Sequence, residues 1–377
     1  MVADSGLQRI VRLTPLADVL ASFDMGVVAV EPREERVAVA VGKTLAADVR
    51  AAANHPAAPL ALRDGYAVRS DTTTDATAYT PAPLSPAPPW IETGAALPAG
   101  ADAVAAVDAV TTQGGAQALA PVAPGEAVLP AGADAAPGTV LKMTGGRLRR
   151  IDAAVLIALG IEQVAIREPK VRVVCVAEGA VIDAAAALVA GAIEADGGVA
   201  AVQPPGTDAL QAALHHQGTD AQTFDAIVAI GGTGSGRNDN SVHTLERAGQ
   251  VAFHGIGIQP GETTAFGYVG ARPVLLLPGR LDGALAGWLT VGRRMLARLA
   301  LRMIEEQPFN AQLARKVASP LGLAEVVPVR RRGFRIEPLA SQYLSHQTLA
   351  RADGWILVPA DSEGYPEGAS VPVRPWP

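Results

Sequence analysis

The chain has 377 residues, which exceeds the usual size of a single hydrophobic core, so we expect several domains. Hydrophobic residues make up 49% of the chain but aromatic residues only 4%, so Ala, Val, Leu and Ile must fill the core. The formal net charge of -6 argues against nucleic-acid or anionic-membrane partners, because such surfaces select an excess of Lys and Arg. Any anion site must therefore be local.

The only cysteine, Cys175, lies in an apolar run that is typical of a buried strand. One thiol can form neither a disulfide nor a multi-thiolate metal site within one chain, which fits a reducing cytoplasm. No signal peptide is evident, and no apolar run approaches the roughly 20 residues needed to span a bilayer. We therefore expect a cytoplasmic protein without a membrane segment.

The first part of the chain is expected to be a short helical lead-in. Residues 13–23 have helical apolar spacing, with Thr14 and Pro15 as the cap and first turn. Residues 147–159 predict a second helix, which ends near Gly160. A strand is expected at residues 164–166, and the segment of this helix and strand is expected to pack back on the lead-in.

Between these two helices, residues 48–140 show short apolar runs that are broken by Pro, Gly, Thr and Asp. Residues 103–107 and 126–129 are examples of such runs. Brief runs between many turn residues are typical of short strands, so this segment predicts a small β-rich module.

The clearest pattern begins at Lys170, where apolar strands alternate with helices as in the βαβ units of a parallel sheet. The expected strands are 171–176, 199–202, 226–230 and 274–277, and the expected helices are 184–195, 208–215, 241–248 and 281–304. The tail after Phe309 holds only short strands between turn residues and predicts a small all-β domain. The expected strands of the tail are 326–329, 334–338, 355–359 and 371–373.

The sequence thus predicts a multidomain α/β plus β fold. Its parts are a three-layer α/β domain, a β-rich inserted module, a helical linker region and a small C-terminal β-barrel-like domain. The expected boundaries are 1–47 plus 141–168 for the linker region, 48–140 for the β-rich module, 169–305 for the α/β domain and 306–377 for the C-terminal domain.

A run of small residues directly follows the expected strand 226–230. The run consists of Gly231, Gly232, Thr233, Gly234, Ser235 and Gly236. Small residues after a parallel strand let backbone N–H groups approach an anion, and open α/β sheets bind ligands at that edge. The spacing fits neither a dinucleotide fingerprint nor a P-loop, and a flexible turn is the alternative interpretation.

A second loop, with Pro278, Gly279 and Arg280, follows the expected strand 274–277. Both loops lie at the carboxyl edge of the sheet, so they could form one pocket. Arg237 and Arg280 are candidate hydrogen-bond donors to a bound phosphate. Asp239 and Asp282 are candidate partners of a metal ion or a hydroxyl group. The alternative for each charged residue is a helix cap or a solvated surface charge.

Covalent catalysis and a histidine metal site find no support in the sequence. The six histidines lack metal-ligand spacing, and no G-x-S-x-G elbow is present. Any chemistry is therefore expected to depend on electrostatic positioning.

Several segments in order resemble one family. The segment DGYA at Asp64 to Ala67, TGAALPAGADAV from Thr93 and GEAVLPAGAD up to Asp134 are similar to family motifs. So are the glycine run with Asp239, the segment 253–267, and the pair of Pro278 and Gly279. The chain is thereby identified as a divergent member of the molybdopterin molybdenumtransferases, the family of MoeA and of the E domain of gephyrin.

The resemblance implies an elongated four-part protomer that forms a homodimer and serves molybdoenzyme clients. Its substrates would be adenylylated molybdopterin and molybdate, which give molybdenum cofactor and AMP with a divalent cation such as Mg2+. The molybdopterin would bind to the α/β domain. The catalytic positions implied by the family are Asp64, Thr93 and Asp134 of one subunit and Asp239 of the other. The first three would face the glycine run and Asp239. Asp239 would also bind metal, and Asp208 is a weaker match to a further acidic position.

The chain departs from the family at two positions where the family motif K-P-G-K has lysines. Gln259 and Glu262 stand there, so two cations are replaced by a neutral and an acidic group. A carboxylate near bound molybdate would repel it. One hypothesis is a transferase in which Arg237 or Arg280 binds the oxyanions. The others are a pterin-binding carrier, insertion helper or regulator, and an unrelated α/β nucleotide binder.

Overall fold

The computed structural model describes residues 8–206, 208–215, 224–303 and 308–376. Contacts divide the chain into two compact units. Unit 1 comprises Met1–Ala47, Thr144–Ala153 and Glu162–Pro377, and unit 2 comprises Asp48–Met143 and Ala154–Ile161. The four-part division expected from the sequence stays a prediction.

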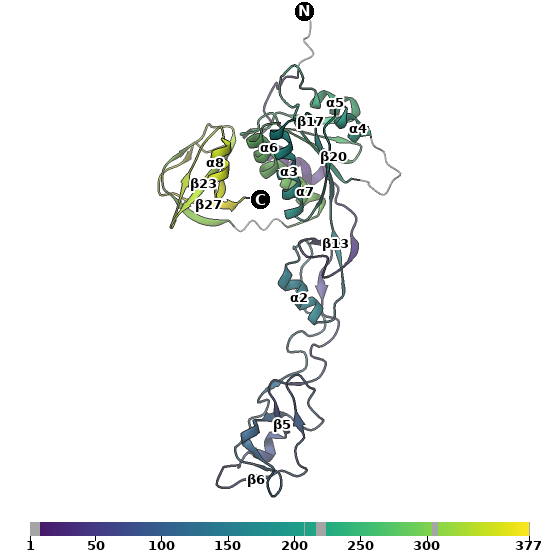
Figure 1. Ribbon diagram of the computed structural model, residues 1–377, viewed down its shortest axis with the longest axis vertical. Coiled ribbons are helices and arrows are strands. Elements are labelled where there is room, and N and C mark those ends of the chain that lie inside the picture. The colour runs from purple at the N-terminus through teal and green to yellow at the C-terminus, as the bar shows by residue number, and fades with distance from the viewer. Residues whose placement is uncertain (1–7, 207, 216–223, 304–307, 377) are drawn as a thin grey trace, which may run out of the picture. The chain divides into compact units, whose positions relative to one another are not determined.

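Unit 1 is built on a six-stranded sheet with the order β15-β14-β16-β20-β19-β17. Figure 1 labels two of its strands, β17 and β20. The strands are β15 (Val199–Gln203), β14 (Lys170–Cys175), β16 (Ala226–Ile230), β20 (Arg272–Leu277), β19 (Ala265–Val269) and β17 (Gln250–His254). The first four are parallel, as expected from the sequence. β19 and β17 add an antiparallel edge that the sequence analysis missed.

Helices cover both faces of this sheet and make three layers. The helices are α1 (Leu16–Gly26), α3 (Ala180–Ala195), α4 (Ala209–His215), α5 (Ser241–Ala248), α6 (Leu281–Gly287) and α7 (Arg293–Leu299). α1, α3, α6 and α7 pack on one face, and α4 and α5 on the other. Alternate strand residues divide between the faces, so Val173 joins the first core and Val174 the second. The predicted α/β domain is confirmed.

The helix expected at residues 281–304 is shorter and interrupted. A π-helical turn, Trp288–Gly292, separates α6 from α7. This turn requires glycine at residue 292, because a Cβ there would lie only 2.2 Å from a carbon of the Trp288 ring. The chain leaves the helix at Leu301, which has a φ of 47°. Ile304, the expected end, lies outside the described residues.

The lead-in of unit 1 forms a three-stranded antiparallel sheet of β1 (Arg33–Arg36), β13 (Gln163–Arg167) and β2 (Thr44–Leu45). The strand expected at residues 164–166 is confirmed as part of β13, and it pairs with two strands of the lead-in. β1 has four charged residues and no apolar alternation, so no strand was expected there. α1 begins at Leu16 because Pro15, with a ψ of 137°, is still extended. The second expected helix is α2 (Arg150–Ala158).

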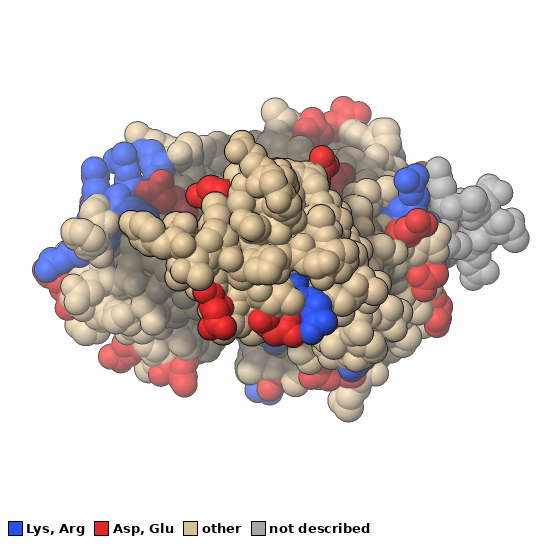
Figure 2. Space-filling view, turned by 90° about the horizontal axis from the view of Figure 1, so that it is seen from below, with Lys and Arg blue, Asp and Glu red and all other residues tan. Residues whose placement is uncertain are grey.

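Unit 2 is β-rich, as predicted, and its strands are at most four residues long. They are β3 (Val49–Arg50), β4 (Leu60–Ala61), β5 (Gly65–Val68), β6 (Ala82–Pro83), β7 (Trp90–Ile91), β8 (Ala103–Ala105), β9 (Val110–Thr111), β10 (Gln117–Ala118), β11 (Val128–Leu129) and β12 (Val140–Lys142), with 3-10 turns at Ser70–Thr73 and Val107–Ala109. Ala and Val dominate the two small cores. The face nearest the viewer in Figure 2 is mostly uncharged, with acidic and basic side chains at its margin.

The C-terminal strands close into a five-stranded barrel with the order β23-β24-β21-β27-β25 and back to β23. The tail elements are β21 (Phe309–Leu313), β22 (Val317–Ala318), β23 (Ala324–Arg332), β24 (Arg335–Pro338), α8 (His346–Arg351), β25 (Gly354–Val358), β26 (Gly364–Tyr365) and β27 (Ser370–Pro375). β18 (Ile258–Gln259) joins β23 in parallel. The barrel-like domain is confirmed, but it also holds the unexpected α8, which the Ser345 side chain caps.

None of the helices within the described ranges has the length and apolar character needed to cross a membrane.

Candidate functional site

Two loops meet at the carboxyl edge of the parallel strands. β16 and β20 run in register, with Ile230 beside Leu277. The loops that follow them touch, because a Cβ built on Gly279 would lie 3.4 Å from the Cα of Gly231. Ile182, from the first turn of α3, lies 3.6 Å from a Cβ built on Gly231. The two loops that were predicted from the sequence are thus in contact at the carboxyl edge of the sheet.

The loop at residues 231–236, called the glycine loop below, requires glycine at its start. Gly231 has a φ of 106° and Gly232 a φ of 69°, a region that disfavours residues with a Cβ. A Cβ on Gly232 would lie 2.3 Å from the Ser241 hydroxyl. That hydroxyl donates to the Gly231 carbonyl at 2.8 Å and ties the loop to α5.

The glycine loop has backbone donors without acceptors. The amide of Gly231 donates to Leu277, and that of Gly236 donates to the Asp239 carboxylate at 2.8 Å. The four amides between them, at residues 232–235, have no acceptor within the described part of the chain. Thr233 is only 1% exposed, and buried amides without a partner are rare in proteins. These amides can therefore donate to a bound oxyanion.

The other polar groups of Thr233 are occupied. Its hydroxyl lies 2.9 Å from the hydroxyl of Thr263, and its carbonyl lies 3.1 Å from Nε2 of His254. β17 and the connection to β19 therefore fix the middle of the glycine loop. No sequence pattern had predicted a role for Thr263 or His254.

Gln8 also holds this loop, and no sequence signal singled it out. Its Nε2 donates to the carbonyls of Gly232 at 2.9 Å and Gly234 at 3.0 Å. Its Oε1 accepts from the amides of Val242 at 2.7 Å and His243 at 3.2 Å. The side chain is 1% exposed, so one residue from the start of the chain joins the glycine loop to α5.

The predicted charged residues around the glycine loop have different environments. Asp239 is half-buried and closes the loop through Gly236. Arg237 is exposed and makes no ion pair with any residue in the described ranges. Asp208 is exposed in the turn before α4. Neither Asp208 nor Asp239 belongs to a group of three or more His, Cys, Asp or Glu side chains that could hold a metal ion among the described residues.

Arg280 lies in the second loop, but its charge is already compensated. Its Nη2 lies 2.6 Å and its Nε 3.1 Å from the carboxylate of the buried Asp282. Asp282 also accepts from the amides of Gly283 and Leu344. The pKa of Arg280 is raised, first by the hydrogen bond to Asp282 and further by nearby acidic groups. The Tyr343 ring lies 4.9 Å from the guanidinium.

The two positions that depart from the family motif lie close to these loops. The carboxylate of Glu262 accepts from the amide of Gly261 at 3.1 Å, and its charge helps to raise the pKa of Arg280. Gln259 pairs with Glu325 across β18 and β23. Oε1 of Gln259 and Oε2 of Glu325 are both buried and have no hydrogen-bond partner in the described structure. Neither position therefore carries the positive charge of the lysine that the family motif has there.

In unit 2, two of the three predicted catalytic residues are in contact. The Asp64 carboxylate accepts from the Thr93 amide at 2.7 Å and from its hydroxyl at 2.9 Å. These two hydrogen bonds lower the pKa of Asp64, the backbone donor contributing most. Asp134 is exposed, and its amide donates to the carbonyl of His55. No hydrogen bond in the described structure joins Asp134 to the other two.

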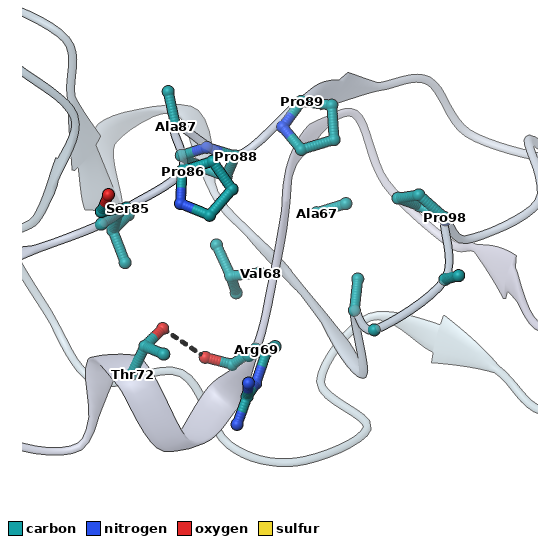
Figure 3. Close-up of a pocket in the computed structure, with 14 residues that line it drawn as sticks. Ala67, Val68, Arg69, Thr72, Ser85, Pro86, Ala87, Pro88, Pro89 and Pro98 are labelled. Atoms are coloured by element: carbon teal, nitrogen blue, oxygen red, sulfur yellow. Dashed lines mark hydrogen bonds between the residues drawn. The ribbon is translucent and has the colours of Figure 1, made fainter.

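Unit 2 also contains a cavity of about 320 Å³, which Figure 3 shows. Its lining combines residues that follow the DGYA segment, such as Val68 and Arg69, with Pro98 from the segment TGAALPAGADAV. Prolines and alanines make up most of the wall. The one charged lining residue, Arg69, forms an ion pair with Asp71, so the cavity is mainly apolar.

The residues that the structure describes do not by themselves form a metal centre. Nowhere in those ranges do three His, Cys, Asp or Glu side chains lie close enough together to hold an ion. Cys175 is buried, and burial raises the pKa of its thiol, which disfavours the reactive thiolate. The site therefore offers hydrogen-bond donors and positioning groups rather than a nucleophile.

Three family models match the chain in order and cover nearly all of it. The MoeA N-terminal region (domain I and II) matches residues 7–160, a "Probable molybdopterin binding domain" matches 157–298, and the MoeA C-terminal region (domain IV) matches 310–376. The chain belongs to the MoeA family. The family predicted from the sequence motifs is therefore confirmed, and the glycine loop lies in the part that the molybdopterin-binding model matches.

Similar proteins agree with this assignment. Molybdopterin molybdenumtransferase 2 of Mycobacterium tuberculosis is 27% identical over 89% of this chain and 92% of that protein. A protein of Methanocaldococcus jannaschii named for molybdopterin biosynthesis is 32% identical, over 40% of this chain and only 36% of its own length. The crystal structure of the MoeA protein from Pyrococcus horikosii has a TM-score of 0.78 at 26% identity, covering 97% of this chain and 100% of that one.

Proposed function

We propose that this MoeA-family member acts in molybdenum cofactor biosynthesis as a molybdopterin molybdenumtransferase. It binds adenylylated molybdopterin at the carboxyl edge of the six-stranded sheet and inserts molybdate, with release of AMP. The observation that carries the proposal is the glycine loop, whose four amides at residues 232–235 lack acceptors in the described structure. The name of the M. tuberculosis relative supports the reaction class.

In this proposal, the chain binds the phosphate of the pterin by neutral donors. Gln259 and Glu262 provide no cation, Arg280 is already paired with Asp282, and Arg237 is exposed at the end of the glycine loop. Preorganised backbone amides stabilise negative charge in a site that excludes water, because the dipoles do not have to reorient. Thr233 and Asp239 keep the loop in one conformation and act as positioning groups. Asp64, Thr93 and Asp134 remain the proposed catalytic positions of unit 2.

A divalent cation, a homodimer, molybdoenzyme clients and a cytoplasmic location belong to the same proposal through the family resemblance. Mg2+ usually binds to one or two carboxylates together with substrate phosphates. The described residues hold no cluster of three or more metal-ligating side chains, so we assign no step to the ion. The reactions should nevertheless contain magnesium.

The test is conversion of adenylylated molybdopterin by the purified full chain with molybdate and magnesium, while AMP and active cofactor are measured. Pterin binding is followed in parallel. We expect AMP release at a rate that depends on molybdate, and loss of both binding and turnover in Gly232→Ala. Binding without turnover would show a carrier or regulator instead. Absence of pterin binding would contradict the proposal altogether.

A further inference from the structure

The contacts of Gln8 use both ends of its side-chain amide. Nε2 donates to two carbonyls of the glycine loop, and Oε1 accepts from two amides at the start of α5. Gln8 is separated from these partners by more than 220 residues in sequence, and its side chain is 1% exposed. Four hydrogen bonds on one buried side chain fix the loop and the helix relative to each other.

The first contact concerns the start of α5, where helix amides would otherwise be free to bind an anion. Oε1 of Gln8 accepts from Val242 and His243. The amide of Ser241 donates to Gly232, and that of Thr244 donates to Asn240. All four amides are therefore occupied within the protein, so a ligand phosphate gains nothing there unless it displaces Gln8.

The second contact concerns the direction of the loop amides. A trans peptide is planar, so its carbonyl and its N–H point in opposite directions. Nε2 of Gln8 holds the carbonyls of Gly232 and Gly234. The N–H groups in the same two peptide units belong to Thr233 and Ser235, and they must point away from Gln8. Both are among the amides that have no acceptor in the described residues.

We propose that Gln8 is a positioning residue of the ligand site: it closes the start of α5 to anions and directs the amides of Thr233 and Ser235 towards the phosphate of the ligand. The identity of that ligand as a molybdopterin rests on the proposed function above. The role of Gln8 towards a phosphate does not. An amide side chain suits this role, because it donates at one end and accepts at the other.

Two substitutions separate the two contacts. Gln8→Ala removes both and frees the amides of Val242 and His243. Gln8→Glu keeps an acceptor for those amides but loses the donor to Gly232 and Gly234, and adds negative charge beside them. Val11→Ala is the matched control, because Val11 is in the same segment and 96% exposed. Circular dichroism of each variant checks that the chain is folded.

The probe is inorganic pyrophosphate, titrated into the isotope-labelled full chain while backbone amide shifts are followed by NMR. In the wild type and in Val11→Ala, we expect the shifts of Thr233 and Ser235 to move and those of Val242 and His243 to stay. In Gln8→Ala, we expect Val242 and His243 to respond and the affinity to fall about tenfold, the size expected for losing one or two hydrogen bonds. Gln8→Glu should bind more weakly still while Val242 and His243 remain silent.

The proposal is refuted if pyrophosphate moves Val242 and His243 in the wild type, if it moves no amide of the glycine loop, or if folded Gln8→Ala binds it like the wild type. A parallel titration with molybdopterin distinguishes this inference from the proposed function. If pyrophosphate behaves as expected but molybdopterin does not bind, the function fails and the role of Gln8 stands. If molybdopterin binds equally to wild type and Gln8→Ala, the function stands and the role of Gln8 fails.

Discussion

The two loops at the carboxyl edge of the sheet differ in what they can offer a ligand. The glycine loop carries no charge between Gly231 and Gly236, yet four of its amides have no acceptor in the described structure. The loop after β20 carries Arg280, but Asp282 already neutralises it. The uncharged glycine loop is therefore the one whose hydrogen-bond donors are available to a ligand.

This difference shows why charge alone is a poor guide to an oxyanion site. An exposed arginine with its own acidic partner contributes little net attraction, because the ion pair must be broken or shared. Fixed backbone amides need no such exchange. A chain that has Gln259 and Glu262 in place of family lysines can therefore still hold a phosphate, provided that the glycine loop keeps its conformation.

The largest effect is expected for Gly232→Ala. The substitution places a Cβ 2.3 Å from the Ser241 hydroxyl in a backbone with a φ of 69°. We expect the free energy of unfolding to fall by about 2–4 kcal/mol, from the left-handed backbone and the overlap together. Phosphate and pterin binding should be lost in calorimetric titrations.

The matched control is Gly270→Ala, which has a similar φ of 60° but no atom within 4 Å of the new Cβ. It should cost only the backbone part, about 1 kcal/mol, and leave binding unchanged. If urea unfolding gave the same decrease in the free energy of unfolding for both variants, the overlap with Ser241 would contribute nothing to the destabilisation of Gly232→Ala.

Asp282→Asn should weaken the fold but not the ligand site. The carboxylate is 3% exposed and accepts from Arg280 and from the amides of Gly283 and Leu344. Loss of hydrogen bonds to a buried charged group typically costs about 2–3 kcal/mol. Phosphate affinity should stay equal or rise, because Arg280 is released. A weaker affinity in the folded variant would mean that the paired Arg280 already takes part in binding.

Arg280→Ala should change phosphate affinity by less than about threefold, because the charge that is removed is already compensated. The same titration on Gln8→Ala, where we expect about a tenfold loss, gives the comparison. A larger loss of phosphate affinity in Arg280→Ala than in Gln8→Ala would show that the loop with Arg280 contributes more to phosphate binding than the glycine loop does.

The smallest effect concerns unit 2. Thr93→Ala removes the hydroxyl donor to Asp64 but keeps the backbone donor, which is the larger cause of the lowered pKa. The pKa of Asp64 should rise only partway towards its ordinary value in an NMR titration of its carboxyl carbon. A lowered pKa stabilises the fold at neutral pH, and this contribution is lost as the pH falls below about 4. An unchanged pKa in Thr93→Ala would show that the backbone amide alone sets it.

The sequence predicted the parts of the fold that follow from continuous local patterns. Buried strands such as β14 and β16 are apolar runs, and the glycine loop follows β16 directly. β17 and β19 were missed, because they have no such uniform run and lie at the antiparallel edge of the sheet. β1 was missed because all its residues are charged.

The contacts within the site were harder to predict than its position. Nothing local marks Gln8, whose partners are more than 220 residues away. Arg280 and Asp282 were both named from the sequence as candidate ligand partners, but spacing does not reveal that they bind each other. Asp64 and Thr93 were predicted together only through the family motifs, and the structure places them in hydrogen-bond contact.

The most direct test of the central claim is a crystal structure of the full chain with molybdopterin bound. We expect phosphate oxygens at about 2.9 Å from the amide nitrogens of Thr233 and Ser235, with Gln8 still bonded to Val242 and Arg280 still paired with Asp282. A phosphate held by Arg280, with the amides of the glycine loop bonded only to water, would contradict it.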